Sequence, residues 1–160
     1  GYGESGEDSH RTAFDVLAWW ARSGLMDIVR PSDNSSPGFV PIGIGDQPSG
    51  VALFASIMTA LYRREKTGKG GEVYTSLMAN GAWSNGSYIQ AGLFNAEFPD
   101  RQEESPLHPF GGRYKTKDGR FLLLAIIDAA KEWPKFLNAM DLNYLNENEK
   151  FSSFKLSYRL

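Results

Sequence analysis

Apolar side chains recur at three- and four-residue spacing through residues 48–66, which is the clearest helical pattern in the chain. The predicted buried face of this helix carries Phe54, Ile57, Met58, Leu61 and Tyr62. Pro48 suits a first turn, and a basic last turn before Gly68 complements the negative end of the helix dipole. The pattern therefore predicts a long helix that begins at Pro48 and ends before Gly68.

Two further helices are predicted, one on each side of residues 48–66. The first follows the polar residues 1–10 and is stopped by Gly24, with Phe14, Leu17, Ala18 and Ala21 on one face. The second covers roughly residues 76–95 and contains Gly81, Gly86 and Gly92. Because glycine lowers helix propensity, these three glycines either indicate close packing of this helix against a neighbour or simply weaken the helix.

Short runs of β-forming residues predict strands in three places. One strand is expected over residues 72–75, and two more over residues 113–116 and 120–127. The last two are joined by Lys117-Asp118-Gly119, and an Asp-Gly pair between such runs indicates a hairpin. A short helix over residues 129–140, with Pro134 near its start, should follow the hairpin. The charged, proline-bearing stretch 99–109 is the predicted domain boundary.

Composition narrows the classes of function. The 160 residues have a net charge of −2 and no long basic run, so we expect no nucleic-acid partner. The chain has no cysteine, and its two histidines are far apart in sequence, so we expect no metal site. The longest apolar run, residues 121–127, is far shorter than the ~20 residues that span a bilayer. We therefore expect no membrane partner and a cytoplasmic location.

One carboxylate, Asp46, lies in a glycine-rich turn directly before the long predicted helix, in the run Gly43-Ile44-Gly45-Asp46-Gln47-Pro48-Ser49-Gly50. This run does not fit a dinucleotide-binding fingerprint, because Pro48 stands at the third glycine position. Two interpretations of Asp46 stay open on the local pattern. It is either a helix cap, worth ~1 kcal/mol, or a nucleophile that the helix dipole keeps ionised and that flanking glycines leave accessible.

Four segments, taken in order, resemble the family III CoA-transferases, also called the CaiB/BaiF family. They are Asp15–Met26, Gly45–Gly50, Ala60–Leu77 with its Arg-Arg-Glu-Lys-Thr-Gly-Lys-Gly run, and Tyr114–Arg120 followed by Trp133-Pro134. The resemblance extends from about Gly1 to Met140, and four ordered segments are more specific than one motif. Members of this family move coenzyme A from an acyl thioester to a carboxylic acid, so the resemblance favours a catalytic Asp46.

The resemblance implies a covalent mechanism on Asp46. This side chain is expected to attack the thioester carbonyl, giving a mixed anhydride and then an aspartyl-CoA thioester. Backbone N–H groups of the glycine-rich turn are expected to stabilise the oxyanion. Asp15 matches a position where several relatives carry Glu or Asp near the active site, and its alternative is an ordinary polar residue on a helix. Candidate substrate-binding residues are Gly45, Gln47, Gly111 and Gly112.

The family fold implies an α/β chain: the later part of a Rossmann-like large domain and the start of a small α+β domain. Residues 1–103 would belong to the large domain and its linker helix, and residues 104–160 would begin the small domain. The expected partners are acyl-CoA, a small carboxylic acid and a second subunit in an interlocked homodimer, with no permanently bound cofactor. Because most CoA-binding residues would precede Gly1, we expect an interior piece that is inactive alone.

Two other functions stay open. The α-methylacyl-CoA racemases of the same superfamily carry a histidine directly before the aspartate that matches Asp15, whereas this chain has Phe14, which cannot relay a proton. This difference disfavours a racemase and leaves other isomerases open. The third possibility is a non-catalytic acyl-CoA-binding chain in which Asp46 is only a helix cap.

Overall fold

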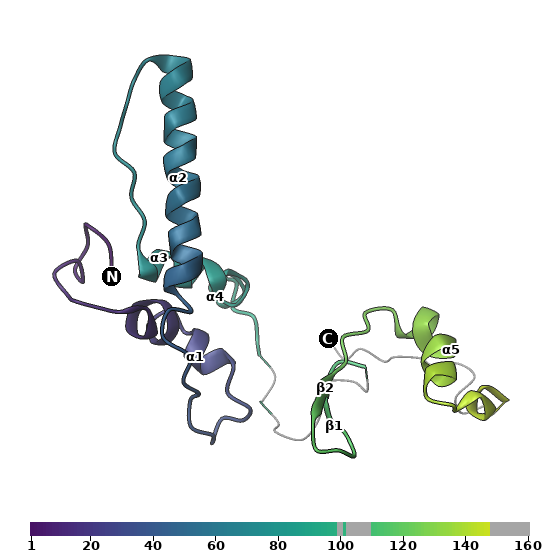
Figure 1. Ribbon diagram of the computed structural model, residues 1–160. Coiled ribbons are helices and arrows are strands. Elements are labelled where there is room, and N and C mark those ends of the chain that lie inside the picture. Colours follow the sequence, from purple (N-terminus) through teal and green to yellow (C-terminus); the bar gives the residue numbers. More distant parts are fainter. Residues whose placement is uncertain (99–100, 102–109, 148–160) are drawn as a thin grey trace. The chain divides into compact units, whose positions relative to one another are not determined.

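The computed structural model describes residues 1–98, 101 and 110–147 (Figure 1). The chain divides into two compact units, residues 1–101 and residues 102–160. Most of the predicted boundary at residues 99–109 lies outside the described residues. Within the described part of the chain, no helix combines the length and the apolar character that crossing a membrane requires.

The first helix of unit 1 is a π-helix, η1, over Val16–Ala21. The N–H of Arg22 donates to the carbonyl of Leu17 five residues earlier (2.9 Å), which is the hydrogen-bond spacing of a π-helix. The predicted face is wrong in part, because Phe14 is 73% exposed and Leu17 is 50% exposed, while Ala18 and Trp20 are buried. A π-helix aligns different residues from the α-helical spacing on which the prediction relied. Gly24 (φ 87°) ends this segment and precedes the short α1, Leu25–Ile28.

The long predicted helix is confirmed as α2, Asp46–Thr67, which begins two residues earlier than expected. Gly45 precedes its first turn, and Gly68 ends it in the left-handed conformation (φ 68°) with its N–H bonded to the carbonyl of Arg64 (2.8 Å). Figure 1 shows α2 extending well beyond the short helices at its base.

The predicted buried face of α2 is wrong in this chain. Among the described residues, Ser49 is the one position of α2 that is buried. The large apolar side chains further along are all more than a third exposed, from 38% at Leu53 and Leu61 to 68% at Val51. Spacing identifies apolar positions on a helix, but burial requires a neighbouring surface, and the described residues do not supply one here.

One predicted helix over residues 76–95 is two helices in the structure. They are α3, Leu77–Ser84, and α4, Gly86–Leu93, separated at Asn85. The prediction of close packing is confirmed for Gly81, where a Cβ atom would lie 2.5 Å from the carbonyl oxygen of Trp19 in η1. Gly86 and Gly92 face open space, so the prediction fails there.

The strand predicted over residues 72–75 is not formed. This segment follows Gly68 and returns beside α2 to the start of α3 without regular structure (Figure 1). A strand requires a hydrogen-bonded neighbour, and none of the residues that the structure describes pairs with this segment.

The predicted hairpin is confirmed in unit 2. It consists of β1, Arg113–Lys115, and a second strand shorter than expected, β2, Phe121–Leu123, which are antiparallel with Tyr114 opposite Leu122. Gly119 adopts φ 82° in the connecting turn, which is the conformation expected of the Asp-Gly pair.

The helix that follows the hairpin in unit 2 packs on a small aromatic core. This helix, α5, covers Ala129–Ala139 with Pro134 inside it, and a short 3₁₀-helix, η2, covers Asn143–Glu147. Phe110 is 2% exposed and meets the rings of Trp133 and Phe136 edge-on, at centroid distances of 5.7 and 4.9 Å. Helices and strands are therefore both present, as an α/β chain requires.

Candidate active site

The carboxylate of Asp15 is the most enclosed polar group at the base of α2. Its residue is 1% exposed, and both oxygens accept backbone N–H groups. Oδ1 accepts from Val16 (2.8 Å), while Oδ2 accepts from Gly43 (2.8 Å) and Gly45 (3.1 Å). Asp15 therefore caps η1 and at the same time fixes a turn that lies about thirty residues further along the chain.

The glycine-rich turn has a conformation that its glycines permit. Gly43 has φ 92°, a left-handed value that favours glycine. Gly45 has an ordinary φ of −89°, and its requirement is steric, because a Cβ atom there would lie 2.6 Å from Cγ of the Trp19 ring. The backbone immediately before Asp46 is thus held by the Asp15 carboxylate and by the indole of Trp19.

Asp46 itself is exposed at the first position of α2. The N-cap of α2 is Gly45, which provides no capping side chain, and the carboxylate of Asp46 makes no hydrogen bond or ion pair to any residue that the structure describes. The positive end of the α2 dipole attracts negative charge at this place. The geometry thus presents an accessible carboxylate without the hydrogen bond that a capping role requires.

Most N–H groups of the turn are already bonded. Those of Gly43 and Gly45 bind Asp15, and the next ones have carbonyl partners: Ile44 with Pro41, Gln47 with Gly43 and Ser49 with Gly45. Pro48 has no N–H. The expectation that the turn offers free N–H donors to an oxyanion is therefore wrong for Gly43 and Gly45, because Asp15 uses both.

The structure brings four of the predicted site residues together in unit 1, and the other two belong to unit 2. Asp15, Gly45, Asp46 and the exposed Gln47 all lie at the base of α2 in unit 1. Gly111 and Gly112 lie in unit 2, directly before β1, where the carbonyl of Gly112 accepts the N–H of Leu124 (2.9 Å). Their predicted role in substrate binding stays a prediction.

Trp19 was not predicted as part of this site. The sequence gives it as one of two tryptophans on a helix, and nothing local links it to Gly45, twenty-six residues later. Its Nε1 is buried without a hydrogen-bond partner among the described residues, as is Oγ of Ser49, one turn into α2. The sequence offered one signal, a glycine at position 45 directly before the predicted helix, because glycine is used where another part of the chain approaches closely.

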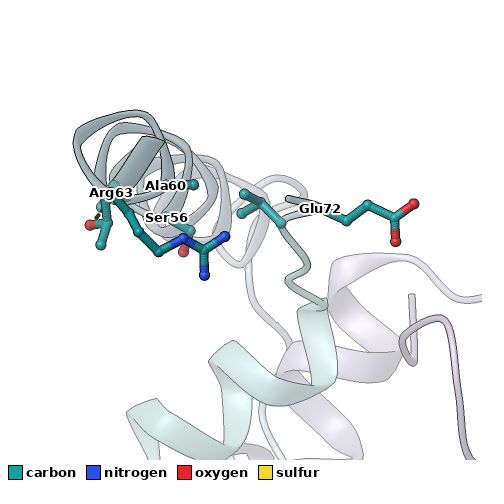
Figure 2. A pocket seen from close by; sticks show the side chains of 7 residues that line it. Ser56, Ala60, Arg63 and Glu72 are labelled. Atoms are coloured by element: carbon teal, nitrogen blue, oxygen red, sulfur yellow. Dashed lines mark hydrogen bonds between the residues drawn. The ribbon is translucent and has the colours of Figure 1, made fainter. Parts of the chain in front are cut away.

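A hollow of about 370 Å³ lies further along α2, between this helix and the returning segment. Figure 2 shows its lining, in which the guanidinium of Arg63 lies across the hollow and the carboxylate of Glu72 points away from it. Its nearest lining residue on α2, Ala55, is about 14 Å along the helix from Asp46 at 1.5 Å per residue. The hollow therefore includes none of the predicted site residues. No cluster of three potential metal ligands occurs within the described ranges.

The sequence matches the family described as CoA-transferase family III over residues 1–159. The chain belongs to this family. Among CoA-transferases, it is 33% identical over 153 residues to (R)-2-hydroxy-4-methylpentanoate CoA-transferase from Clostridioides difficile, covering 96% of this chain and 38% of that protein. It is 31% identical over 158 residues to cinnamoyl-CoA:phenyllactate CoA-transferase from Clostridium sporogenes, covering 97% of this chain and 38% of that protein.

Two solved structures share this fold. A CaiB/BaiF family protein from Brucella suis superposes with a TM-score of 0.70 at 20% identity, over 96% of this chain and 40% of that one. A protein from Mycobacterium tuberculosis gives a TM-score of 0.71 at 20% identity, over 95% of this chain and 39% of that one. The family III chain thus spans about two fifths of the length of these relatives.

Proposed function

We propose that the complete protein transfers coenzyme A from an acyl-CoA thioester to a small carboxylic acid, through covalent intermediates on Asp46. Membership of CoA-transferase family III supports the reaction class. The observation that carries the choice of nucleophile is the exposed Asp46 carboxylate, which has no hydrogen bond to the described residues and lies at the start of a 22-residue helix.

The first half of the reaction forms two covalent intermediates. A carboxylate oxygen of Asp46 attacks the thioester carbonyl, so that a C–O bond forms, the C–S bond breaks and CoA leaves as the thiolate. The thiolate then attacks the side-chain carbonyl of Asp46 in the mixed anhydride. This step releases the donor as its carboxylate and leaves an aspartyl-CoA thioester. No proton is gained or lost overall, and each difficult displacement is divided into two easier ones.

The second half repeats these steps with the acceptor acid. Its carboxylate attacks the aspartyl-CoA carbonyl and expels CoA thiolate, which gives a new mixed anhydride. The thiolate attacks the acceptor's carbonyl, the new acyl-CoA leaves, and Asp46 is regenerated as a carboxylate. Asp46 lies at the positive end of the α2 dipole, which attracts the negative charge of its carboxylate at the start and at the end of this cycle.

The acceptor is a small carboxylic acid, and 2-hydroxy acids are the first to assay. One relative is named for 2-hydroxy-4-methylpentanoate and another for phenyllactate, and both are 2-hydroxy acids. We further propose that residues 1–103 belong to a large domain and residues 104–160 to a small one, in an interlocked homodimer, with Gln47, Gly111 and Gly112 near the substrate.

The test is replacement of the nucleophile in the complete protein. We expect Asp46→Ala to lower kcat by about 10⁴-fold or more, the scale on which loss of a nucleophile acts, while acyl-CoA binding measured by calorimetry is retained. Asp128→Ala is the matched control, because Asp128 is a true cap whose Oδ1 accepts the N–H of Lys131 (3.1 Å). The control should lose about 1 kcal/mol of stability and keep its kcat.

Two results would overturn this function. Turnover of Asp46→Ala at the rate of the parent protein would remove the nucleophile from the mechanism. Exchange of the α-proton of acyl-CoA with solvent, without any need for an acceptor acid, would indicate an isomerase of the same superfamily instead.

A further inference from the structure

Asp15 joins two segments that are distant in sequence. Its carboxylate accepts three N–H groups, one from the start of η1 and two from the glycine-rich turn, at donor–acceptor distances of 2.8, 2.8 and 3.1 Å. Hydrogen bonds to an ionised acceptor are stronger than those between neutral groups. With 1% of the residue exposed, these bonds are shielded from water.

The surroundings of Asp15 do not suit it to proton transfer. Its partners are backbone amides, which neither give up nor take up a proton at neutral pH, and no side chain of the described residues is hydrogen bonded to it. A general acid or base must come within about 3 Å of the reacting group, directly or through one water. An enclosed carboxylate whose oxygens are occupied by the backbone does not meet this requirement.

Asp15 is coupled to Asp46 through one peptide unit. The N–H that Oδ2 accepts belongs to Gly45, the residue directly before Asp46, and the other side of Gly45 lies against the ring of Trp19. A movement of this backbone would displace the Asp46 carboxylate by a similar amount. Covalent attack requires the reacting atoms to be held about 3–3.5 Å apart, and a misplacement of about 1 Å can cost 100-fold in rate.

We infer that Asp15 is a positioning residue for the transfer reaction: its buried carboxylate fixes the Gly43–Gly45 turn and thereby the place from which Asp46 attacks. This inference rests on the proposed role of Asp46. It assigns Asp15 a part in the chemistry that involves no contact with the substrate.

The test uses Asp15→Asn and Gly43→Ala in the complete protein. Asp15→Asn keeps the size of the side chain but replaces one accepting oxygen by an NH₂ group that faces N–H donors. Gly43→Ala keeps Asp15 and strains the same turn, because φ is 92° there while no atom lies within 4 Å of the added Cβ. For both variants we expect kcat to fall about 100-fold, with KM for acyl-CoA within about threefold of the parent.

Two further readouts separate positioning from other roles. The shape of the kcat–pH profile should be unchanged, because no titrating catalytic group has been removed. Amide hydrogen exchange of peptides covering residues 41–47 should become faster in both variants, because Asp15→Asn removes the carboxylate that binds the N–H groups at positions 43 and 45, and Gly43→Ala strains the turn that carries them. Asn85→Ala is the matched control: Asn85 is 6% exposed and its Nδ2 donates to the carbonyl of Ser23 (2.8 Å). This control should lower Tm and leave kcat, KM and exchange of residues 41–47 unchanged.

The outcomes divide cleanly. Lower kcat at constant KM with faster exchange in the turn supports the inference, and Gly43→Ala supplies this result even if Asp15→Asn does not fold. Parent-like kcat in either folded variant, or loss of one limb of the pH profile with unchanged exchange, overturns it. The exchange measurement does not depend on the reaction. A fully active Asp46→Ala would therefore refute the proposed function, whereas an inactive Asp46→Ala beside a fully active Asp15→Asn would refute this inference alone.

Discussion

The base of α2 is packed against other residues of this chain, whereas the rest of the same helix is largely exposed. At the base, Gly45 and Ser49 are buried, and Gly45 is held between the Asp15 carboxylate and the Trp19 ring. Beyond Ser49, α2 contains no buried residue, although it carries large apolar side chains such as Phe54 (64% exposed) and Tyr62 (65% exposed). One continuous helix thus passes from a densely contacted end to an exposed apolar one.

This difference indicates where the stability of unit 1 arises. Burying a large apolar side chain stabilises a fold by about 1.5–3 kcal/mol, and side chains that stay mostly exposed contribute little of this. The contacts of η1 with the turn and with α3 therefore dominate, and the turn leads directly into the predicted nucleophile, Asp46. The described residues therefore supply contacts for the turn directly before Asp46, but they do not cover the rest of α2.

The largest change in stability is expected from a substitution at the contact between α3 and η1. In Gly81→Ala, the new Cβ would lie 2.5 Å from the carbonyl oxygen of Trp19 and 2.8 Å from Cβ of Ser23. Backbone would have to move, so we expect a loss of about 1–3 kcal/mol in the free energy of unfolding, measured by denaturant titration. Gly92→Ala in α4, with open space around it, should instead gain about 0.5 kcal/mol. Equal changes in the free energy of unfolding for the two variants would contradict the close packing of α3 against η1.

A smaller effect is expected on the exposed part of α2. In the 160-residue chain, Phe54→Ser should change the free energy of unfolding by less than about 0.5 kcal/mol, because this ring is 64% exposed. The same denaturant titration measures it, with Gly81→Ala as the reference. A loss of several kcal/mol in the free energy of unfolding would show that Phe54 is buried in this chain. The exposed part of α2 would then not differ from its packed base.

The smallest effect concerns an ion pair at the surface of unit 1. The hydrogen bond from Arg101 (2.8 Å), with the charges of Arg101 and Arg30, lowers the pKa of Asp27 below its ordinary value. A folded-state pKa that is lower than the unfolded one stabilises the fold above the unfolded pKa, and this contribution is lost as pH falls through the folded pKa. Asp27 is 57% exposed, so water screens the pair and the effect should be slight.

Arg101→Ala tests that pair. Thermal unfolding of the parent and the variant should differ at pH 6 and converge below the pKa of Asp27, where the carboxyl is protonated in both states. A difference that stays constant down to the lowest pH would show that Arg101 acts through packing and not through charge.

The local sequence pattern was enough to predict a structural feature when the residues that determine it lie close together in sequence. The extent of α2, its end at Gly68 and the hairpin turn at Gly119 follow from spacing, dipole and backbone preference within a few residues. The π-winding of η1 was missed because helical spacing assumes α geometry. The strand over residues 72–75 was predicted from side-chain type, which does not reveal whether a partner strand exists.

In the candidate site too, features that depend on neighbouring residues were predicted, and features that depend on distant residues were not. Asp46 was found because glycines and a helix start flank it directly. The partners of Asp15 lie 28 and 30 residues away, and the contact of Gly45 with Trp19 spans a similar separation. Such contacts depend on how elements pack, so the sequence left Asp15 with two interpretations. The structure places it in contact with the turn and enclosed from solvent.

The most direct measurement follows oxygen through the reaction. If Asp46 forms anhydrides with both acids, an acceptor labelled with ¹⁸O in its carboxylate must leave one labelled oxygen on Asp46 when the new acyl-CoA departs. After a single turnover by the complete protein, mass spectrometry of the peptide that contains Asp46 should therefore show a gain of about 2 Da, as covalent catalysis on this carboxylate requires. Turnover without any label on Asp46 would contradict the account.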